Sequence, residues 1–67
     1  MNEEQRLLTA GEVSEYLQVS VRTLAHWRRS GEGPRAYRIG NRIRYRAVDV
    51  NRYVAEHAIR EPAWKAA

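Results

Sequence analysis

The chain has 67 residues, a formal net charge of +4 at pH 7, no cysteine and two histidines. A chain of this length forms one small domain that buries only about 60% of the surface of its unfolded form. The lack of cysteine excludes a disulfide framework and a cysteine-based zinc site, and two histidines are too few for a structural metal site. No apolar run approaches the ~20 residues of a membrane span, and the N-terminus lacks the basic region of a signal peptide. We therefore expect a cytoplasmic protein with no membrane partner.

The positive charge is concentrated in one segment. Eleven of the twelve basic residues are arginines, and eight of these fall in residues 22–46, where Glu32 is the one acid. This block has a net charge of +7, whereas residues 1–21 carry −3 and residues 47–67 are neutral. Arginine suits phosphate and guanine because its planar guanidinium donates two parallel hydrogen bonds. The clustering favours a nucleic acid as the partner, ahead of an anionic membrane or an acidic protein.

The first predicted helix spans residues 10–17. Thr9 and Glu12 have the spacing of a capping box, in which each side chain accepts a hydrogen bond from the backbone N–H of the other residue. Val13, Tyr16 and Leu17 follow at i, i+3 and i+4, and they form the stripe that we expect to be buried.

A second helix is predicted between Ser20, a good N-cap, and Ser30, with Gly31 as the left-handed C-cap residue. Two short helices separated by three or four residues are typical of a helix-turn-helix, whose second helix lies in the recognition position. The inner side of this helix, including its flank, holds Val21, Leu24, Ala25, Trp27 and Arg28. Its outer side holds no acid and consists of Arg22, Thr23, His26 and Arg29.

A β-hairpin is predicted at residues 37–45, because apolar and basic residues alternate on both sides of Gly40-Asn41. A two-residue loop would pair Ile39 with Arg42, whereas a three-residue or bulged turn pairs Ile39 with Ile43 and residue 37 with residue 45. We expect the second register, because it places all the apolar side chains on the inner face: Tyr37, Ile39, Ile43 and Tyr45. It places three arginines on the outer face: Arg38, Arg42 and Arg44.

A third helix is predicted over residues 47–59. Its expected buried stripe is Val50, Tyr53, Val54 and His57. We interpret Asp49 as an acid of the first turn that tethers an arginine of the hairpin. Pro62 ends the regular structure, and Trp64 falls in the tail beyond it.

These elements predict a mostly α-helical fold with a small β-hairpin, which is a winged helix-turn-helix of three helices and a two-stranded wing. Residues 7–59 form the domain, residues 1–6 a flexible leader and residues 60–67 a flexible tail. Catalysis is not expected, because the sequence offers no nucleophile–base pair, no glycine-rich phosphate loop and no converging carboxylates. We expect no cofactor and no metal, and we place Trp27 in the core.

Nine residues are the predicted DNA contacts: Arg22, Thr23, His26, Arg28, Arg29, Arg38, Arg42, Arg44 and Arg46. Arg28 lies at the side of its helix and suits a phosphate better than a base. The hydroxyl of Thr23 either donates to a phosphate or makes only a local bond to the backbone. The hairpin arginines either lie along the phosphates or enter the minor groove, or else they form an ordinary solvated face.

The sequence resembles the excisionase-type DNA-binding domain, a compact winged-helix relative of the MerR superfamily. The resemblance covers about residues 7–57 and is carried by LLTAGEVSEYL at residues 7–17, VSVRTLAHW at 19–27, Gly31, RIGNRIRYR at 38–46, Asp49-Val50 and Tyr53-Val54. It implies sequence-selective binding of double-stranded DNA, with Arg22, Thr23 and His26 entering the major groove or gripping its edge. We expect none of the effector-binding and coiled-coil segments of full MerR regulators.

The resemblance therefore implies a stand-alone excisionase of a phage or integrative element, also called a recombination directionality factor, in the nucleoid of a bacterial host cell. Such a protein binds repeated sites cooperatively beside copies of itself, bends the DNA and directs an integrase toward excision. An acidic surface with Glu12 and Glu15 would meet the basic hairpin of a neighbouring copy. A small MerR-like transcriptional regulator without an effector domain is the alternative. A second alternative is a basic protein-interaction module that holds an acidic partner.

Overall fold

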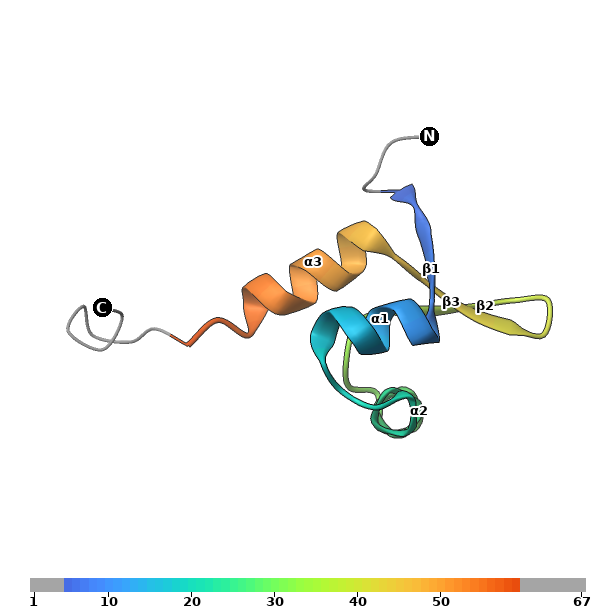
Figure 1. The fold of residues 1–67 in the computed structure, drawn as a ribbon, viewed down its shortest axis with the longest axis horizontal. Helices are drawn as coiled ribbons and strands as arrows, with labels where there is room; N and C mark the ends of the chain where they lie inside the picture. The colour runs from blue at the N-terminus through green and yellow to red at the C-terminus, as the bar shows by residue number, and fades with distance from the viewer. Residues whose placement is uncertain (1–4, 60–67) are drawn as a thin grey trace.

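A computed structural model describes residues 5–59, which fold into three helices and a three-stranded antiparallel sheet (Figure 1). The elements are β1 (Leu7–Thr9), α1 (Ala10–Leu17), α2 (Val21–Ser30), β2 (Ala36–Ile39), β3 (Arg42–Arg46) and α3 (Ala47–Glu56). This is the winged helix-turn-helix predicted above, with one strand more than expected. Residues 1–4 of the predicted leader and the whole predicted tail, with Pro62 and Trp64, lie outside the described residues. No helix within residues 5–59 is long and apolar enough to cross a membrane.

The ends of α1 and α2 are formed by the predicted caps. The backbone N–H of Glu12 donates to Thr9 Oγ1 at 3.1 Å, and the N–H of Thr9 donates to Glu12 Oε1 at 2.9 Å, which completes the capping box. At the start of α2, Ser20 Oγ accepts from the N–H of Thr23 at 2.9 Å. Gly31 ends α2 in the left-handed conformation, as predicted. Both helices therefore begin where a side chain accepts from a free N–H group, and they end where the backbone N–H of a left-handed residue, Gln18 or Gly31, donates to a carbonyl of the last turn.

The core is formed by one side chain from each of four elements. Val13, Leu24, Tyr45 and Val50 are at most 1% exposed and come from α1, α2, β3 and α3. Leu17 and the half-buried Trp27 pack against this cluster, in line with the prediction. Tyr16 and Val21 were expected on buried faces, yet they are 60% and 49% exposed. The core is too small to cover the whole apolar stripe of each short helix.

Strand β1 was not predicted. It pairs antiparallel with β3, so that the strand order is β1-β3-β2 and the last strand of the hairpin is the central one. Leu8 lies opposite Tyr45, and the carbonyl of Arg6 accepts from the N–H of Ala47 at 3.0 Å. A strand of three residues is too short for its alternation to stand out, and its partner lies more than thirty residues further along the chain.

The register of the hairpin differs from the predicted one. Ile39 pairs with Arg42 and Arg38 with Ile43, so that a two-residue Gly40-Asn41 turn joins β2 and β3. Gly40 has φ +63°, whereas Asn41 has a negative φ, as in the type II′ turn that fits the twist of paired strands. The expectation of a longer turn was therefore wrong. The apolar pattern favours the longer turn, but glycine readily adopts the positive φ that the first central residue of a type II′ turn requires.

The observed register sorts the side chains of the hairpin differently from the prediction. Ala36, Arg38, Ile43 and Tyr45 share the face that packs toward α2, because directly opposed residues point to the same side. Tyr37 and Ile39 lie on the opposite face with Arg42 and Arg44, so their predicted inward orientation was wrong. Tyr37 finds a polar partner there, since its hydroxyl donates to Asp49 Oδ2 at 2.8 Å.

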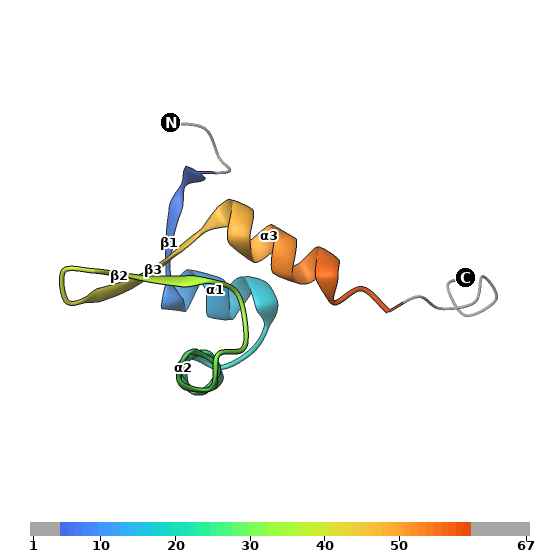
Figure 2. The same cartoon turned by 180° about the vertical axis from the view of Figure 1, so that it is seen from behind.

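Helix α3 ends at Glu56, three residues before its predicted end. Its first turn packs on the core through Val50, whereas its C-terminal end extends away from the other elements (Figures 1 and 2). Tyr53 is half-buried between the rings of Trp27 and His57, with ring centroids 5.7 Å and 4.0 Å away. Val54 and His57 are exposed, so the predicted stripe is correct only over its first half.

Candidate nucleic-acid interface

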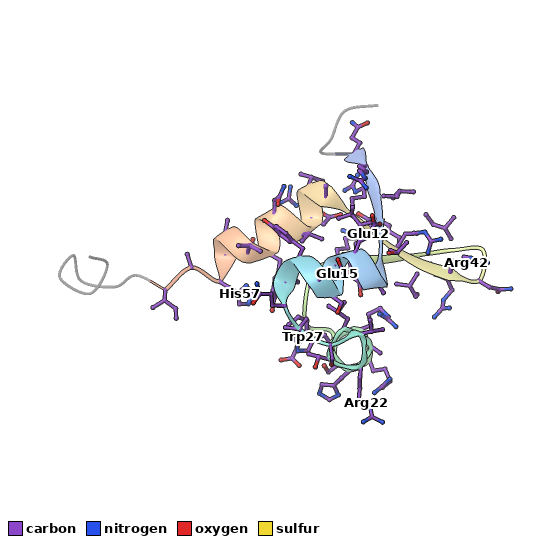
Figure 3. All side chains as sticks on the ribbon, viewed as in Figure 1. Glu12, Glu15, Arg22, Trp27, Arg42 and His57 are labelled. Atoms are coloured by element: carbon purple, nitrogen blue, oxygen red, sulfur yellow. The ribbon has the colours of Figure 1, made fainter. Side chains whose placement is uncertain are left out.

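The outer face of α2 presents cations to solvent. Arg22, His26 and Arg29 are exposed, as predicted, and Figure 3 shows Arg22 pointing away from the body of the protein. Thr23 is half-buried, and its Oγ1 accepts from the hydroxyl of Ser20 at 2.9 Å. The hydroxyl proton of Thr23 therefore stays available for an acceptor outside the protein.

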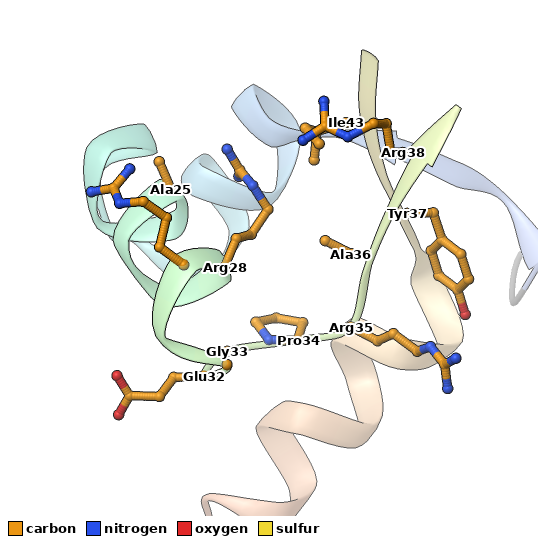
Figure 4. A pocket seen from close by; sticks show the side chains of 12 residues that line it. Ala25, Arg28, Glu32, Gly33, Pro34, Arg35, Ala36, Tyr37, Arg38 and Ile43 are labelled. Atoms are coloured by element: carbon orange, nitrogen blue, oxygen red, sulfur yellow. The ribbon is translucent and has the colours of Figure 1, made fainter. Parts of the chain in front are cut away.

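A cleft of about 560 Å³ separates the second half of α2 from the wing, the hairpin of β2 and β3 (Figure 4). The residues that carry charge along this cleft are Arg28, Arg29, Glu32, Arg35 and Arg38. Arg28 and Arg38 extend from its two walls, one from α2 and the other from β2 (Figure 4). Arg35 lines the cleft with the base of its side chain, whereas its guanidinium lies 5.7 Å from the centroid of the Tyr37 ring, on the far side (Figure 4). The cations of Arg28, Arg29 and Arg38 still outnumber the one acid, which makes the cleft an anion-binding environment.

Arg28 is held in place by the core. Its Nη1 donates to the hydroxyl of Tyr45 at 3.0 Å, and Tyr45 is only 1% exposed. The bond joins the recognition helix to the central strand and orients the half-buried guanidinium before any ligand arrives. The remaining N–H groups of Arg28 are free to bind an anion in the cleft.

The other predicted arginines of the wing do not share one face. Arg38 lines the cleft, whereas Arg42 and Arg44 lie together on the opposite face of the hairpin. The prediction that all three arginines share one face was therefore wrong. Arg42 is exposed at the far end of the wing (Figure 3). Arg44 is half-buried, and its Nη1 donates to the carbonyl of Ile43 at 2.8 Å. The wing thus offers cations on both of its faces.

Within residues 5–59, Arg46 is the one predicted site arginine that has an acidic partner. Its Nε donates to Asp49 Oδ2 at 3.0 Å, and Asp49 is only 5% exposed. Burial alone would raise the pKa of Asp49, but the hydrogen bonds from Arg46 and Tyr37 and the charges of Arg46 and Arg52 outweigh it, so this pKa lies below its ordinary value. The predicted tether between Asp49 and an arginine of the hairpin is confirmed.

The remaining predicted arginines have no ion-pair partner among residues 5–59. Within residues 5–59, the arginines that have a carboxylate within 4.0 Å are Arg6, Arg46 and Arg52. Six site arginines have none: Arg22, Arg28, Arg29, Arg38, Arg42 and Arg44. Arg35 also lacks a carboxylate partner and lines the cleft, although it was not among the predicted contacts because it precedes the alternating pattern of the hairpin. Its place in the basic segment was the signal that could have found it.

No group of histidine and acidic side chains in the described part of the chain is arranged to hold a metal ion. The α2 face, the cleft and the wing therefore form a surface whose chemistry is that of arginine, hydroxyl and histidine hydrogen-bond donors. These groups suit phosphates and the acceptor edges of bases.

Comparison with known proteins agrees with this geometry. The family model described as "Helix-turn-helix domain" matches residues 7–58, from β1 to just beyond the end of α3. A search of curated proteins gives no match. The matched segment contains both helices of the motif, the cleft and the wing. The chain belongs to the helix-turn-helix domain family, a family of DNA-binding domains.

Proposed function

We propose that the protein binds double-stranded DNA sequence-selectively, with α2 in the major groove and the wing on the adjoining backbone and minor groove. The observation that carries this proposal is the set of uncompensated arginines on both walls of one cleft. Arg28 and Arg38 face the cleft without a carboxylate partner, and the hydroxyl of Tyr45 orients Arg28. A DNA strand that leaves the major groove beside α2 would run through this cleft and place its phosphates between these guanidiniums.

For the biological role, we infer an excisionase that directs an integrase toward excision of a phage or integrative element. The resemblance of residues 7–57 to excisionase-type domains supports this role, and the integrase and neighbouring copies of the chain are its inferred partners. The protein would catalyse no step itself. Glu12 already binds the backbone of Thr9 and the guanidinium of Arg6, at 3.2 Å, so Glu15 is the acid of α1 that is better placed to meet a neighbour.

The DNA proposal predicts a strong salt dependence. Binding to a mixed-sequence duplex, followed by fluorescence anisotropy, should weaken with a log–log salt slope near −4 to −5, as expected for about five phosphate contacts. Replacing Arg38, Arg42 and Arg44 together with alanine should reduce this slope by about 2–3, because those contacts are lost. Arg52→Ala is the matched control, since Arg52 is exposed on α3 away from the cleft, and its slope should equal that of the wild type.

The absence of binding at low salt would contradict the DNA proposal and favour the basic module that holds an acidic protein. An unchanged slope in the triple variant would show that the wing does not touch the DNA.

The excisionase role is tested with the integrase of the same element and a supercoiled DNA that carries both attachment junctions. We expect excision product only when the protein is added, and Arg22→Ala should abolish it by removing a major-groove contact. If excision does not depend on the protein, while a footprint covers a promoter, the small transcriptional regulator replaces this role.

A further inference from the structure

The tip of the wing pairs an apolar side chain with a free cation. Ile39 and Arg42 are the last pair before the two-residue turn, and they stand side by side on the face that points away from the cleft. Ile39 is 50% exposed, although its residue type favours the core. Arg42 is exposed and has no carboxylate within 4.0 Å among the described residues.

The dimensions of DNA limit what the wing can insert. The minor groove of B-DNA is about 6 Å wide, whereas two paired strands lie about 4.8 Å apart before their side chains are added. In a complex, the hairpin backbone would therefore stay outside the groove, and the side chains beside the turn would be the ones that reach into it. Among these, Ile39 offers a branched apolar group and Arg42 a guanidinium on the same face.

The two side chains favour the same base pairs for different reasons. Guanine carries an N2 amino group on the floor of the minor groove, which would occupy the space that a branched side chain needs, whereas A·T pairs lack it. Runs of A·T pairs also narrow the groove and make its potential more negative, which attracts arginine. Apolar side chains are recurrent minor-groove contacts of DNA-binding proteins.

We propose that Ile39 and Arg42 at the wing tip read the minor groove and select A·T base pairs beside the segment that α2 contacts. This inference rests on the proposed DNA binding and adds a sequence preference to it. Ile39 supplies the steric selection against the guanine amino group, and Arg42 supplies the attraction to the narrow groove.

Inosine isolates the minor groove from the major groove. An inosine·cytosine pair lacks only the N2 amino group of G·C, so its major groove remains that of G·C while its minor groove resembles that of A·T. We therefore compare two duplexes of one G·C-rich sequence, with either guanine or inosine, by fluorescence anisotropy at the same salt concentration. The wild-type protein should bind the inosine duplex about five- to twentyfold more tightly.

The assignment to the two residues is tested by matched substitutions. Ile39→Thr keeps the β-branching and the strand preference of the residue, but threonine is one carbon shorter and its hydroxyl can accept a hydrogen bond from the guanine amino group. The preference for inosine should therefore fall to about twofold. Arg42→Ala should weaken binding to both duplexes and also reduce the preference. Val54→Thr is the control: it also replaces a β-branched apolar side chain with threonine, at a 42% exposed position on α3, and it should retain the full preference. Far-UV circular dichroism checks that each variant is folded.

The outcomes separate this inference from the proposed function. Equal binding of both duplexes by the wild type would overturn the minor-groove assignment and leave DNA binding intact. A preference that survives in both Ile39→Thr and Arg42→Ala would overturn the choice of these residues. Absence of binding to either duplex at low salt would overturn the DNA proposal and this inference together.

Discussion

Gly33→Ala is expected to destabilise the fold by about 2–4 kcal/mol. Gly33 has φ +80°, a backbone conformation that is strained for alanine. A Cβ at this position would also lie 2.7 Å from Cε3 and 3.0 Å from Cβ of Trp27. Trp27 packs against the core and lies near the ring of Tyr53, so it has little room to retreat. A loss of this size is a large part of the roughly 3–10 kcal/mol expected for a chain of this length.

Gly31→Ala is the matched control for this effect. Gly31 has nearly the same φ, +77°, but a Cβ there would meet no atom within 4 Å. It should therefore cost only about 1 kcal/mol, the backbone part of the effect. Urea unfolding followed by circular dichroism measures both free energies of unfolding. Equal losses in the two variants would show that Trp27 moves aside and that its contact with Gly33 is not tight.

Asp49→Ala is expected to cost about 2 kcal/mol, and Asp49→Asn about half of that. The buried carboxylate accepts from Tyr37 at 2.8 Å and from Arg46 at 3.0 Å, both at Oδ2. It thereby ties β2 and the end of β3 to the first turn of α3. Alanine leaves both donors without this partner, whereas asparagine keeps an acceptor for Tyr37 but loses the charge that attracts Arg46.

The contribution of Asp49 should also depend on pH. Because the folded state lowers the pKa of this carboxyl, its stabilisation is fully present above the ordinary aspartate pKa of about 3.9 and is lost as the pH falls through the lower folded value. The difference in unfolding free energy between the wild type and Asp49→Asn should therefore be constant near neutral pH and shrink below about pH 4. The capping box also lowers the pKa of Glu12, but this effect is common to both proteins and cancels in their difference.

Glu56→Gln provides the control on the same helix. Glu56 is exposed and has no ion pair within residues 5–59, so its substitution should leave both the stability and its pH dependence unchanged. A difference between the wild type and Asp49→Asn that stays constant down to pH 2 would contradict the role of the ionised carboxylate.

The features that could be predicted from the sequence depend on residues that are close together in the chain. The capping box of Thr9 and Glu12, the Ser20 cap and the Gly31 end of α2 each involve side chains and backbone groups within a few residues. The exposed cations of α2 follow from the helical period, and a tether between Asp49 and an arginine of the hairpin follows from their closeness in the chain.

The features that sequence reasoning missed depend on pairing between distant segments. The partner of β1 is β3, which lies far along the chain. The register of the wing follows from the two-residue Gly40-Asn41 turn, although a longer turn would have placed all the apolar side chains on one face. A shift of one residue moves every side chain of a strand to the other face. For this reason Ile39 lies on the face away from the cleft, Arg38 lines the cleft, and Tyr37 is a partner of Asp49.

The sequence by itself determined the helix-turn-helix, its caps and the excess of arginine, because helical structure and charge are encoded locally. Only the tertiary structure decided which arginines are free, which is bound to Asp49, and how Tyr45 orients Arg28 in the cleft. Those properties require side chains from α2, β2, β3 and α3 to meet, and the hydrogen bonds that result have no periodic signal in the chain.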